Sequence, residues 1–305
     1  MMTGKMKKPM MMGSFDDIFA EVGKLSERKI VVAGAEEEEA VLALIEARKA
    51  GFASGILVGK QNLIAAILEK HDQDCSGWDI RDARSPSEAS FTAIACLKNG
   101  EAQALMKGGV KTGDLMRAVL DKERGLAPKR LLSHLFVFEP PSLGRLLILS
   151  DGGMVPMPDL SQKKEIIYNA LEGALALGYS LPKTALLSAF SHPREDVPST
   201  CEASILAGLN REGWLSETII EGPLPLDVAI ERGAAVLIVP DIESGNFMGK
   251  ALMYFTKARA GLVIMGADYP IIVTSRVDNA RTRLNSIALS LVIQQRMEML
   301  HASCP

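Results

Sequence analysis

The chain has 305 residues, of which 48% are hydrophobic and 23% are charged, and its formal net charge is -3. This is a globular composition, and the near-neutral charge argues against nucleic acid as the main partner. The four cysteines form no C-x-x-C pair, which argues against zinc and redox motifs. Because the amino terminus lacks the apolar core of a signal peptide and no apolar run is long enough to span a membrane, we expect a cytoplasmic protein with no membrane partner.

Strand-like and helix-like segments alternate along most of the chain. Residues 29–33 form a β-branched run typical of a buried strand, and the acidic run 36–39 then favours the start of a helix. Further strands are expected at 55–58, 102–106, 184–189, 218–220, 235–239, 262–265 and 271–274. Helices are expected at 85–99, 112–125, 161–177, from 199, at 247–258 and at 279–300. This alternation predicts an α/β protein built of crossover units, with a mostly parallel sheet.

The alternation is interrupted in the middle of the chain. Residues 135–138 and 145–149 are both strand-like, and a proline- and glycine-containing turn joins them as a hairpin. The sheet is therefore expected to be mixed at this point, and the hairpin is the natural boundary between two lobes. We assign residues 1–140 and 263–305 to the first α/β lobe and residues 141–262 to the second.

Small and polar residues gather where the expected strands end. The clusters are Lys107-Gly108 with Thr112, Asp151-Gly152-Gly153, Glu221-Gly222-Pro223, Asp241 with Gly245-Asn246, and Ser275-Arg276 with Asp278. Ligands of open α/β sheets bind at the carboxyl ends of strands, so we expect these clusters to line one cleft. Helices starting near Thr112 and Asn246 would present N–H groups to an anion there. Taken singly, each cluster also has the composition of an ordinary turn.

The last cluster combines a hydroxyl, a guanidinium and a carboxylate at a junction between a strand and a helix. Arginine is well shaped to hold phosphate oxygens through two hydrogen bonds, so Arg276 indicates a phosphate site. The alternative is structural, because Ser275 and Asp278 are also ordinary helix caps and one arginine can simply be solvated.

The sequence argues against a nicotinamide site, a P-loop and a serine hydrolase. There is no G-x-G-x-x-G after the first strand, no G-x-x-x-x-G-K-[ST] and no G-x-S-x-G. His134 could exchange a proton near neutral pH, although a structural histidine is the more common case. The histidines and aspartates show no ligand spacing, so no metal site is expected.

In this order, the clusters resemble the phosphate acetyltransferase/phosphate butyryltransferase family. The stretches that carry the resemblance are Lys107-Gly108-x-x-Lys111-Thr112-Gly113, Leu132-Ser133-His134, Gly222-Pro223-Leu224 with Leu226-Asp227, Val239-Pro240-Asp241-Ile242-Glu243-x-Gly245-Asn246, and Pro270-Ile-Ile-Val-Thr-Ser275-Arg276-x-Asp278. The Ser133-His134 pair looks closer to the butyryl branch.

The resemblance implies transfer of a short acyl group between coenzyme A and inorganic phosphate, by direct attack of a thiolate in a ternary complex. Coenzyme A is then a substrate, and no cofactor is required. The resemblance further implies a homodimer with a two-lobed α/β/α fold like that of isocitrate and isopropylmalate dehydrogenases. It gives catalytic roles to Ser275, which would orient the thiol, and to Arg276, which would bind phosphate or the developing oxyanion. The substrate-binding residues implied by it are Lys107, Thr112, Ser133, Gly222, Pro223, Asp241, Gly245 and Asn246.

Two departures from the family pattern keep alternatives open. The position of the thiol base in the acetyl branch is occupied here by Thr282, which leaves Asp278 and His134 as candidate bases. The segment 230–234 is also shorter than in relatives. A catalytically silent homologue that binds coenzyme A or acyl phosphate is therefore one alternative. An oxidoreductase of the same fold is another, although it would need metal-binding aspartates and a nucleotide loop.

Overall fold

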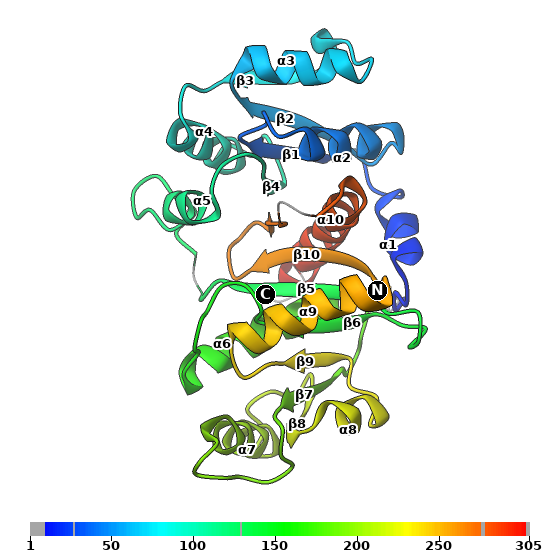
Figure 1. Ribbon diagram of the computed structural model, residues 1–305, viewed down its shortest axis with the longest axis vertical. Coiled ribbons are helices and arrows are strands. Elements are labelled where there is room, and N and C mark those ends of the chain that lie inside the picture. The colour runs from blue at the N-terminus through cyan, green and yellow to red at the C-terminus, as the bar shows by residue number, and fades with distance from the viewer. Residues whose placement is uncertain (1–9, 27, 129, 276–277, 303–305) are drawn as a thin grey trace, which may run out of the picture.

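The computed structural model describes residues 10–26, 28–128, 130–275 and 278–302, and the side chains of the last helix up to residue 299 (Figure 1). The strands are β1 (Arg28–Ala33), β2 (Ala53–Gly59), β3 (Asp79–Asp82), β4 (Ala104–Lys107), β5 (Ser133–Glu139), β6 (Leu147–Ser150), β7 (Lys183–Leu187), β8 (Ile219–Leu224), β9 (Val236–Ile238), β10 (Arg259–Met265) and β11 (Ile271–Ile272). The helices are α1 (Phe15–Val22), α2 (Glu38–Lys49), α3 (Gln61–Lys70), α4 (Pro86–Lys98), α5 (Thr112–Val119), α6 (Leu160–Ala176), α7 (Pro198–Arg211), α8 (Leu226–Glu231), α9 (Ile242–Thr256) and α10 (Ala280–Ala302), with a short 3-10 helix at Cys75–Gly77.

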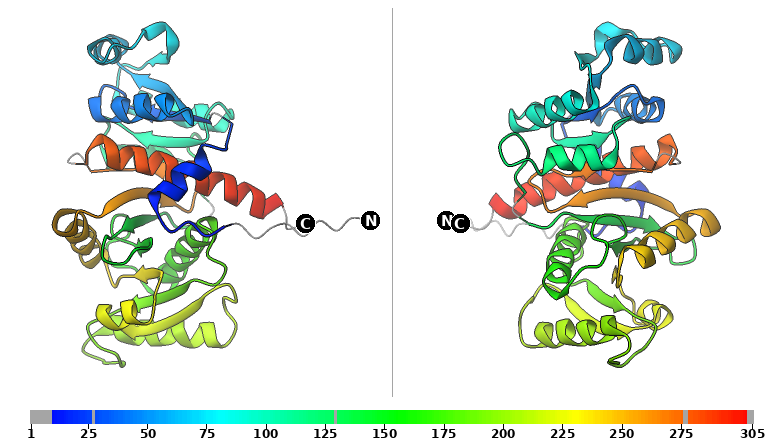
Figure 2. Two further views of the ribbon diagram at one scale, coloured as in Figure 1. Left: turned by 90° about the vertical axis from the view of Figure 1, so that its right-hand side faces the viewer. Right: turned by 60° about the vertical axis from the view of Figure 1, so that its left-hand side comes forward.

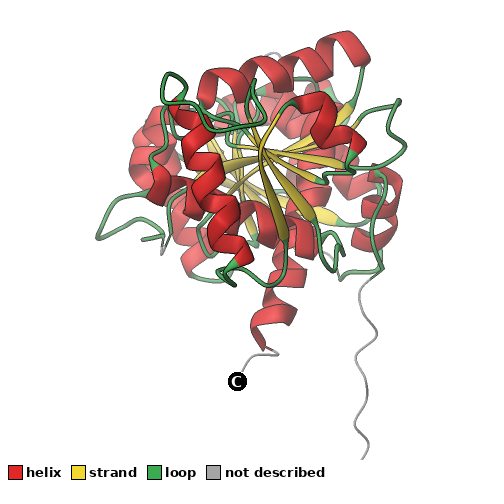
Figure 3. Cartoon of the chain, turned by 90° about the horizontal axis from the view of Figure 1, so that it is seen from below, coloured by secondary structure: helices red, strands yellow, loops and turns green. Residues whose placement is uncertain are grey.

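The described strands form one sheet of eleven strands in the order β3-β2-β1-β4-β11-β10-β5-β6-β9-β7-β8. Its two outer parts are parallel, as crossover units require. In the middle, β10 pairs antiparallel with both β11 and β5, and β5 pairs antiparallel with β6. The expected hairpin and the mixed sheet are thereby confirmed, and helices cover both faces of the sheet (Figure 3). The lobe boundaries themselves stay a prediction.

The pairing of β5 with β10 determines which side chains face which side of the sheet. Phe136 lies opposite Leu262 and His134 lies opposite Ile264. Because successive residues of a strand point to opposite faces, His134 and Phe136 share one face while Leu135 belongs to the other.

One face of the sheet is covered without interruption and the other is not. A single apolar core joins α1, α2, α3, α6, α7 and α10 to one face. On the opposite face, α4 and α5 pack in one core, and α8 and α9 pack in a second, separate core. Leu262 belongs to the second of these cores and Ile264 to the first, so the gap between them lies over β10. Figure 2 shows α5 and α9 on this interrupted side.

Helix starts differ from the sequence-based expectations in three places. α9 begins at Ile242 because the Asp241 side chain accepts a hydrogen bond from Ser244 N, so Asn246 lies within the helix and not at its start. α7 begins at Pro198 and Ser199 does not cap it; the Glu202 side chain instead pairs with Lys163. The N-cap of α5 is Lys111, and Thr112 is the first helical residue.

The region between β2 and α4 contains elements that the sequence analysis did not anticipate. α3 buries only Ile64 and Leu68, and β3 is a charged edge strand, so neither produces a strong apolar pattern. Across the described ranges, no helix has both the length and the apolar character that crossing a bilayer requires.

A buried ion pair joins the start of α2 to α10. Both terminal nitrogens of Arg283 donate to the Glu37 carboxylate, at 2.8 and 2.7 Å, and the Arg283 side chain is fully buried. Glu37 belongs to the acidic run whose neighbour Glu38 instead pairs near the surface with Lys70 and His71. Two adjacent glutamates therefore have very different surroundings.

Replacing Glu37 with glutamine leaves the buried Arg283 charge without a counterion. We expect the free energy of unfolding, measured in urea, to fall by about 3 kcal/mol. Glu38→Gln is the matched control and should cause a much smaller change, since Lys70 is exposed to solvent and His71 is partly exposed. Equal losses in the two variants would contradict a specific role for the buried pair.

Candidate active site

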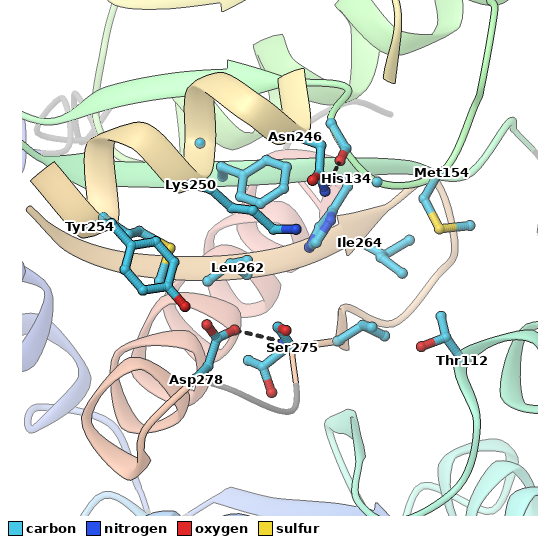
Figure 4. Close-up of a pocket in the computed structure, with 17 residues that line it drawn as sticks. Thr112, His134, Met154, Asn246, Lys250, Tyr254, Leu262, Ile264, Ser275 and Asp278 are labelled. Carbon is cyan, nitrogen blue, oxygen red and sulfur yellow. Dashed lines mark hydrogen bonds between the residues drawn. The ribbon is translucent and has the colours of Figure 1, made fainter. Parts of the chain in front are cut away.

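The gap between the two cores is a cleft of about 810 Å³, counting the space open to solvent (Figure 4). Its lining residues come from α5, β5, the loop after β6, α9, β10 and the turn between β11 and α10. They are Thr112, His134, Phe136, Gly152, Gly153, Met154, Asn246, Gly249, Lys250, Met253, Tyr254, Leu262, Ile264, Val273, Thr274, Ser275 and Asp278.

The floor of the cleft is the sheet face at β5 and β10. His134 and Phe136 lie side by side on β5 with ring centroids 4.3 Å apart, and Leu262 and Ile264 oppose them on β10. All four side chains are buried. This floor is apolar apart from the imidazole, which suits a hydrocarbon group.

α9 lies across this floor and approaches the neighbouring loop very closely. A Cβ atom on Gly245 would lie 2.7 Å from the Cα of Gly152, so only glycine fits there. The Asn246 side chain donates a hydrogen bond to the Gly152 carbonyl at 3.3 Å. Lys250 and Tyr254 follow on the same helix face, and Figure 4 shows both extending into the cleft.

The loop after β6 is held by one buried carboxylate. Asp151 accepts hydrogen bonds from the backbone N–H groups of His134, Gly153, Met154 and Val155, at 2.9 to 3.1 Å. Burial raises the pKa of Asp151, and these four donors act in the opposite direction. Asp151 thus fixes both the loop and the backbone from which His134 projects.

The turn after β11 brings Ser275 and Asp278 together. Asp278 accepts a hydrogen bond from the Ser275 backbone N–H at 2.7 Å and donates its own N–H to the Ser275 carbonyl. Burial raises the pKa of the Asp278 carboxyl, while the Ser275 N–H and the charges of Arg283 and Lys250 lower it to a smaller extent.

Burial also shifts the pKa of His134, in the direction opposite to that of Asp278. It lowers the pKa of His134 to about 4, against the opposing effect of a hydrogen bond to the backbone of Val273, so the ring is neutral at pH 7. Within the described part of the chain, the buried His134 Nε2 and Thr274 Oγ1 have no hydrogen-bond partner. Both residues belong to the cleft lining.

Five of the sequence-predicted site residues meet in this cleft: Thr112, His134, Asn246, Ser275 and Asp278. Arg276 lies outside the described residues. The others have different surroundings. Ser133 points away from the cleft and accepts a hydrogen bond from Asn169 at 2.8 Å, and the buried Lys107 ammonium donates to the carbonyls of Gly108 and Val110.

The remaining predicted residues support the site or lie far from it. Asp241 and Gly245 position α9 as described above. Gly222 and Pro223 belong to β8, the edge strand. β8 is four strands away from β5, which corresponds to about 19 Å at the usual strand spacing. Only the ends of the central strands therefore meet at the cleft.

Among the lining residues that sequence reasoning missed, Lys250, Met253 and Tyr254 belong to α9. With Asn246 they share one helix face at intervals of three and four residues. The spacing of these residues is visible in the sequence. Because the helix was predicted to start at Phe247, Asn246 was not recognised as a member of the same helix face. Among the described residues, no group of three or more His, Cys, Asp or Glu side chains is arranged to hold a metal ion.

Comparisons with known proteins agree on one kind of protein. Residues 76–291 match the family described as "Phosphate acetyl/butaryl transferase". A phosphate butyryltransferase of Clostridium beijerinckii is 34% identical over 297 residues, covering 93% of this chain and 98% of the relative. A solved branched-chain phosphotransacylase of Enterococcus faecalis V583 is 27% identical with a TM-score of 0.76, covering 88% of this chain and 99% of that chain.

The fold extends beyond these relatives. A 4-hydroxythreonine-4-phosphate dehydrogenase of Klebsiella pneumoniae superposes with a TM-score of 0.59 at 13% identity, covering 88% of this chain and 100% of that chain. At this identity the likeness concerns the fold alone. It confirms the expected dehydrogenase-like α/β class.

His134 should make stability depend on pH in a defined window. The unfolded chain binds a proton on this residue below about pH 6.5, whereas the folded chain does so only near pH 4. Between these values the unfolded state holds more protons, so the free energy of unfolding must rise with pH. The stability advantage of the wild type over His134→Gln, measured in urea, should therefore shrink as the pH falls from 6.5 to 4.

His192→Gln is the control for the loss of a histidine, because His192 is exposed and lies outside the cleft lining. A His134→Gln curve that runs parallel to the wild type would show that the imidazole is not buried as a neutral group.

Proposed function

Because the chain belongs to the phosphate acetyl/butyryl transferase family, we propose that it transfers a short acyl group between coenzyme A and inorganic phosphate. The acyl groups considered are butyryl, acetyl and branched chains. The observation that carries the proposal is a buried carboxylate, Asp278, hydrogen-bonded to Ser275 beside an apolar cleft in a member of this family. The site thus combines a proton acceptor with room for a hydrocarbon chain.

The reaction proceeds by direct attack. The coenzyme A thiol gives its proton to the base, and the thiolate sulfur attacks the carbonyl carbon of the acyl phosphate. A carbon–sulfur bond forms, and the bond between the carbonyl carbon and the phosphate oxygen breaks. Phosphate leaves with that electron pair, and the reverse reaction retraces these steps. No acyl group is attached to the protein.

Burial selects Asp278 as the base over His134. Removing a carboxylate from water favours its neutral form, which makes it a stronger base, whereas the same change makes an imidazole a weaker one. The pKa of Asp278 is raised and that of His134 is lowered to about 4. Asp278 therefore takes the thiol proton, and the neutral His134 forms part of the cleft floor beside it.

Positive charge and N–H groups surround the place proposed for phosphate. The Lys250 ammonium enters the cleft from α9 (Figure 4). The first turn of α5 begins at Thr112, and its N-cap Lys111 makes no side-chain capping bond in the described structure, which leaves N–H groups for an anion. Arg276 and the Ser275 hydroxyl keep the roles that the resemblance implies, in binding phosphate or oxyanion and orienting the thiol.

The other expected properties are carried forward as predictions. We propose a homodimer that acts in the cytoplasm. Support for association comes from α9, where Phe247 and Phe255 expose 68% and 86% of their surface. Large exposed aromatic side chains on one helix are typical of protein interfaces.

The activity is tested by incubating the protein with acetyl-CoA, butyryl-CoA or isobutyryl-CoA and following the release of free thiol. We expect release that requires inorganic phosphate, with formation of the acyl phosphate. Release without phosphate would indicate a hydrolase. If coenzyme A binds but no thiol is released with any substrate, the chain is the silent homologue.

The identity of the base is tested with two variants. Asp278→Asn keeps an acceptor for the Ser275 N–H but removes the base, so kcat should fall by about 10²–10⁴-fold with a smaller change in KM. Lys250→Met removes a charge that lowers the pKa of Asp278, so the acidic limb of the kcat/KM profile should move to higher pH.

Asp196→Asn is the control, because Asp196 forms an exposed ion pair with Arg194 outside the cleft lining. An Asp278→Asn enzyme with nearly full turnover would exclude this carboxylate as the base.

A further inference from the structure

Two glycines of α9 face the same side of the helix but have different surroundings. A Cβ atom on Gly245 would lie within 3 Å of Gly152, Asp151 and Val239, so packing requires the glycine. A Cβ atom on Gly249 would instead lie 3.4 Å from Phe138, 3.8 Å from Phe136 and 3.9 Å from Leu149. Those are ordinary van der Waals distances, so packing does not require glycine at position 249.

A glycine inside a helix is unfavourable relative to alanine, because its backbone loses more conformational freedom on folding. None of the three atoms nearest to a Cβ atom on Gly249 belongs to another glycine, and the φ angle of Gly249 is not in the left-handed region. Neither close packing nor backbone conformation therefore requires glycine here. What the missing side chain does provide is space, since Gly249 lines the cleft together with Phe136 and Met253.

A continuous path of contacts leads from the reacting groups to Gly249. The ring centroids of His134 and Phe136 are 4.3 Å apart, and Phe136 is one of the three residues, with Phe138 and Leu149, that a Cβ atom on Gly249 would contact. Polar groups are found at the other end, on the turn of Ser275 and Asp278. An acyl group whose carbonyl lies at this polar end would therefore extend its hydrocarbon tail over Phe136.

We propose that Gly249 sets the length of the acyl pocket, and that its missing side chain admits four-carbon straight or branched acyl groups in preference to acetyl. The walls of this pocket are Phe136, Leu262 and Met253. This inference rests on the proposed function and adds its specificity. A single methyl group in an apolar pocket changes discrimination by about tenfold or more, so one Cβ atom is enough to alter the preference.

The test compares kcat/KM for butyryl-CoA and acetyl-CoA in the phosphate-dependent assay. Gly249→Ala should lower the ratio of butyryl to acetyl at least about tenfold, mainly through loss of activity with butyryl-CoA. Met253→Ala removes a wall and should act in the opposite direction, raising activity with hexanoyl-CoA relative to butyryl-CoA. A ratio unchanged by Gly249→Ala would overturn the proposal, as would a Met253→Ala variant whose preference is that of the wild type.

Gly208→Ala in α7 is the matched control. It is also a helical glycine, a Cβ atom there would meet only the end of the Arg211 side chain at 3.8 Å, and it is outside the cleft. Both alanine variants should raise the midpoint of thermal unfolding by about 2 °C, while only Gly249→Ala changes the acyl ratio. If the wild type itself releases no thiol with any acyl-CoA, the proposed function fails, and that outcome is distinct from an unchanged ratio in active variants.

Discussion

The antiparallel pairing of β5 with β10 is the constraint on which the site depends. It joins the two parallel parts of the sheet and places His134 opposite Ile264 and Phe136 opposite Leu262 on one face. A slip of one residue in either strand would turn the two cleft-facing side chains of that strand toward the continuous core on the other face. The cleft has its apolar floor because this register places these side chains on the interrupted face.

The continuous face of the sheet contributes mainly to stability, and the interrupted face contains the cleft. On the continuous face, α10 is packed along the sheet and anchored to α2 by the buried Glu37–Arg283 pair. The same helix begins just after Asp278, so the anchored helix also fixes the carboxylate at the cleft. Burial there is unfavourable for a charged group, yet it is what gives Asp278 a raised pKa and greater basicity.

The strand and helix alternation, the central hairpin and the junction of Ser275 with Asp278 could be predicted from the sequence, because each depends on a local pattern. The number of strands in the sheet and their order could not be predicted in this way. Gly222 lies on β8, four strands away from β5, although its turn composition looks like that of the residues that line the cleft. Lys250 was missed because a side chain at Asp241 moves the start of α9 upstream, and the periodic face of a helix can be read only when its start is known.

The strand order also bears on how the chain is made. β10 and β11 lie in the middle of the sheet, between β4 and β5, although they are the last strands to be synthesised. During translation the two outer parts can form early, but their central edges stay unpaired until residue 272 has left the ribosome. Open strand edges are sites of aggregation, so these two edges are exposed to it until the last strands have been synthesised.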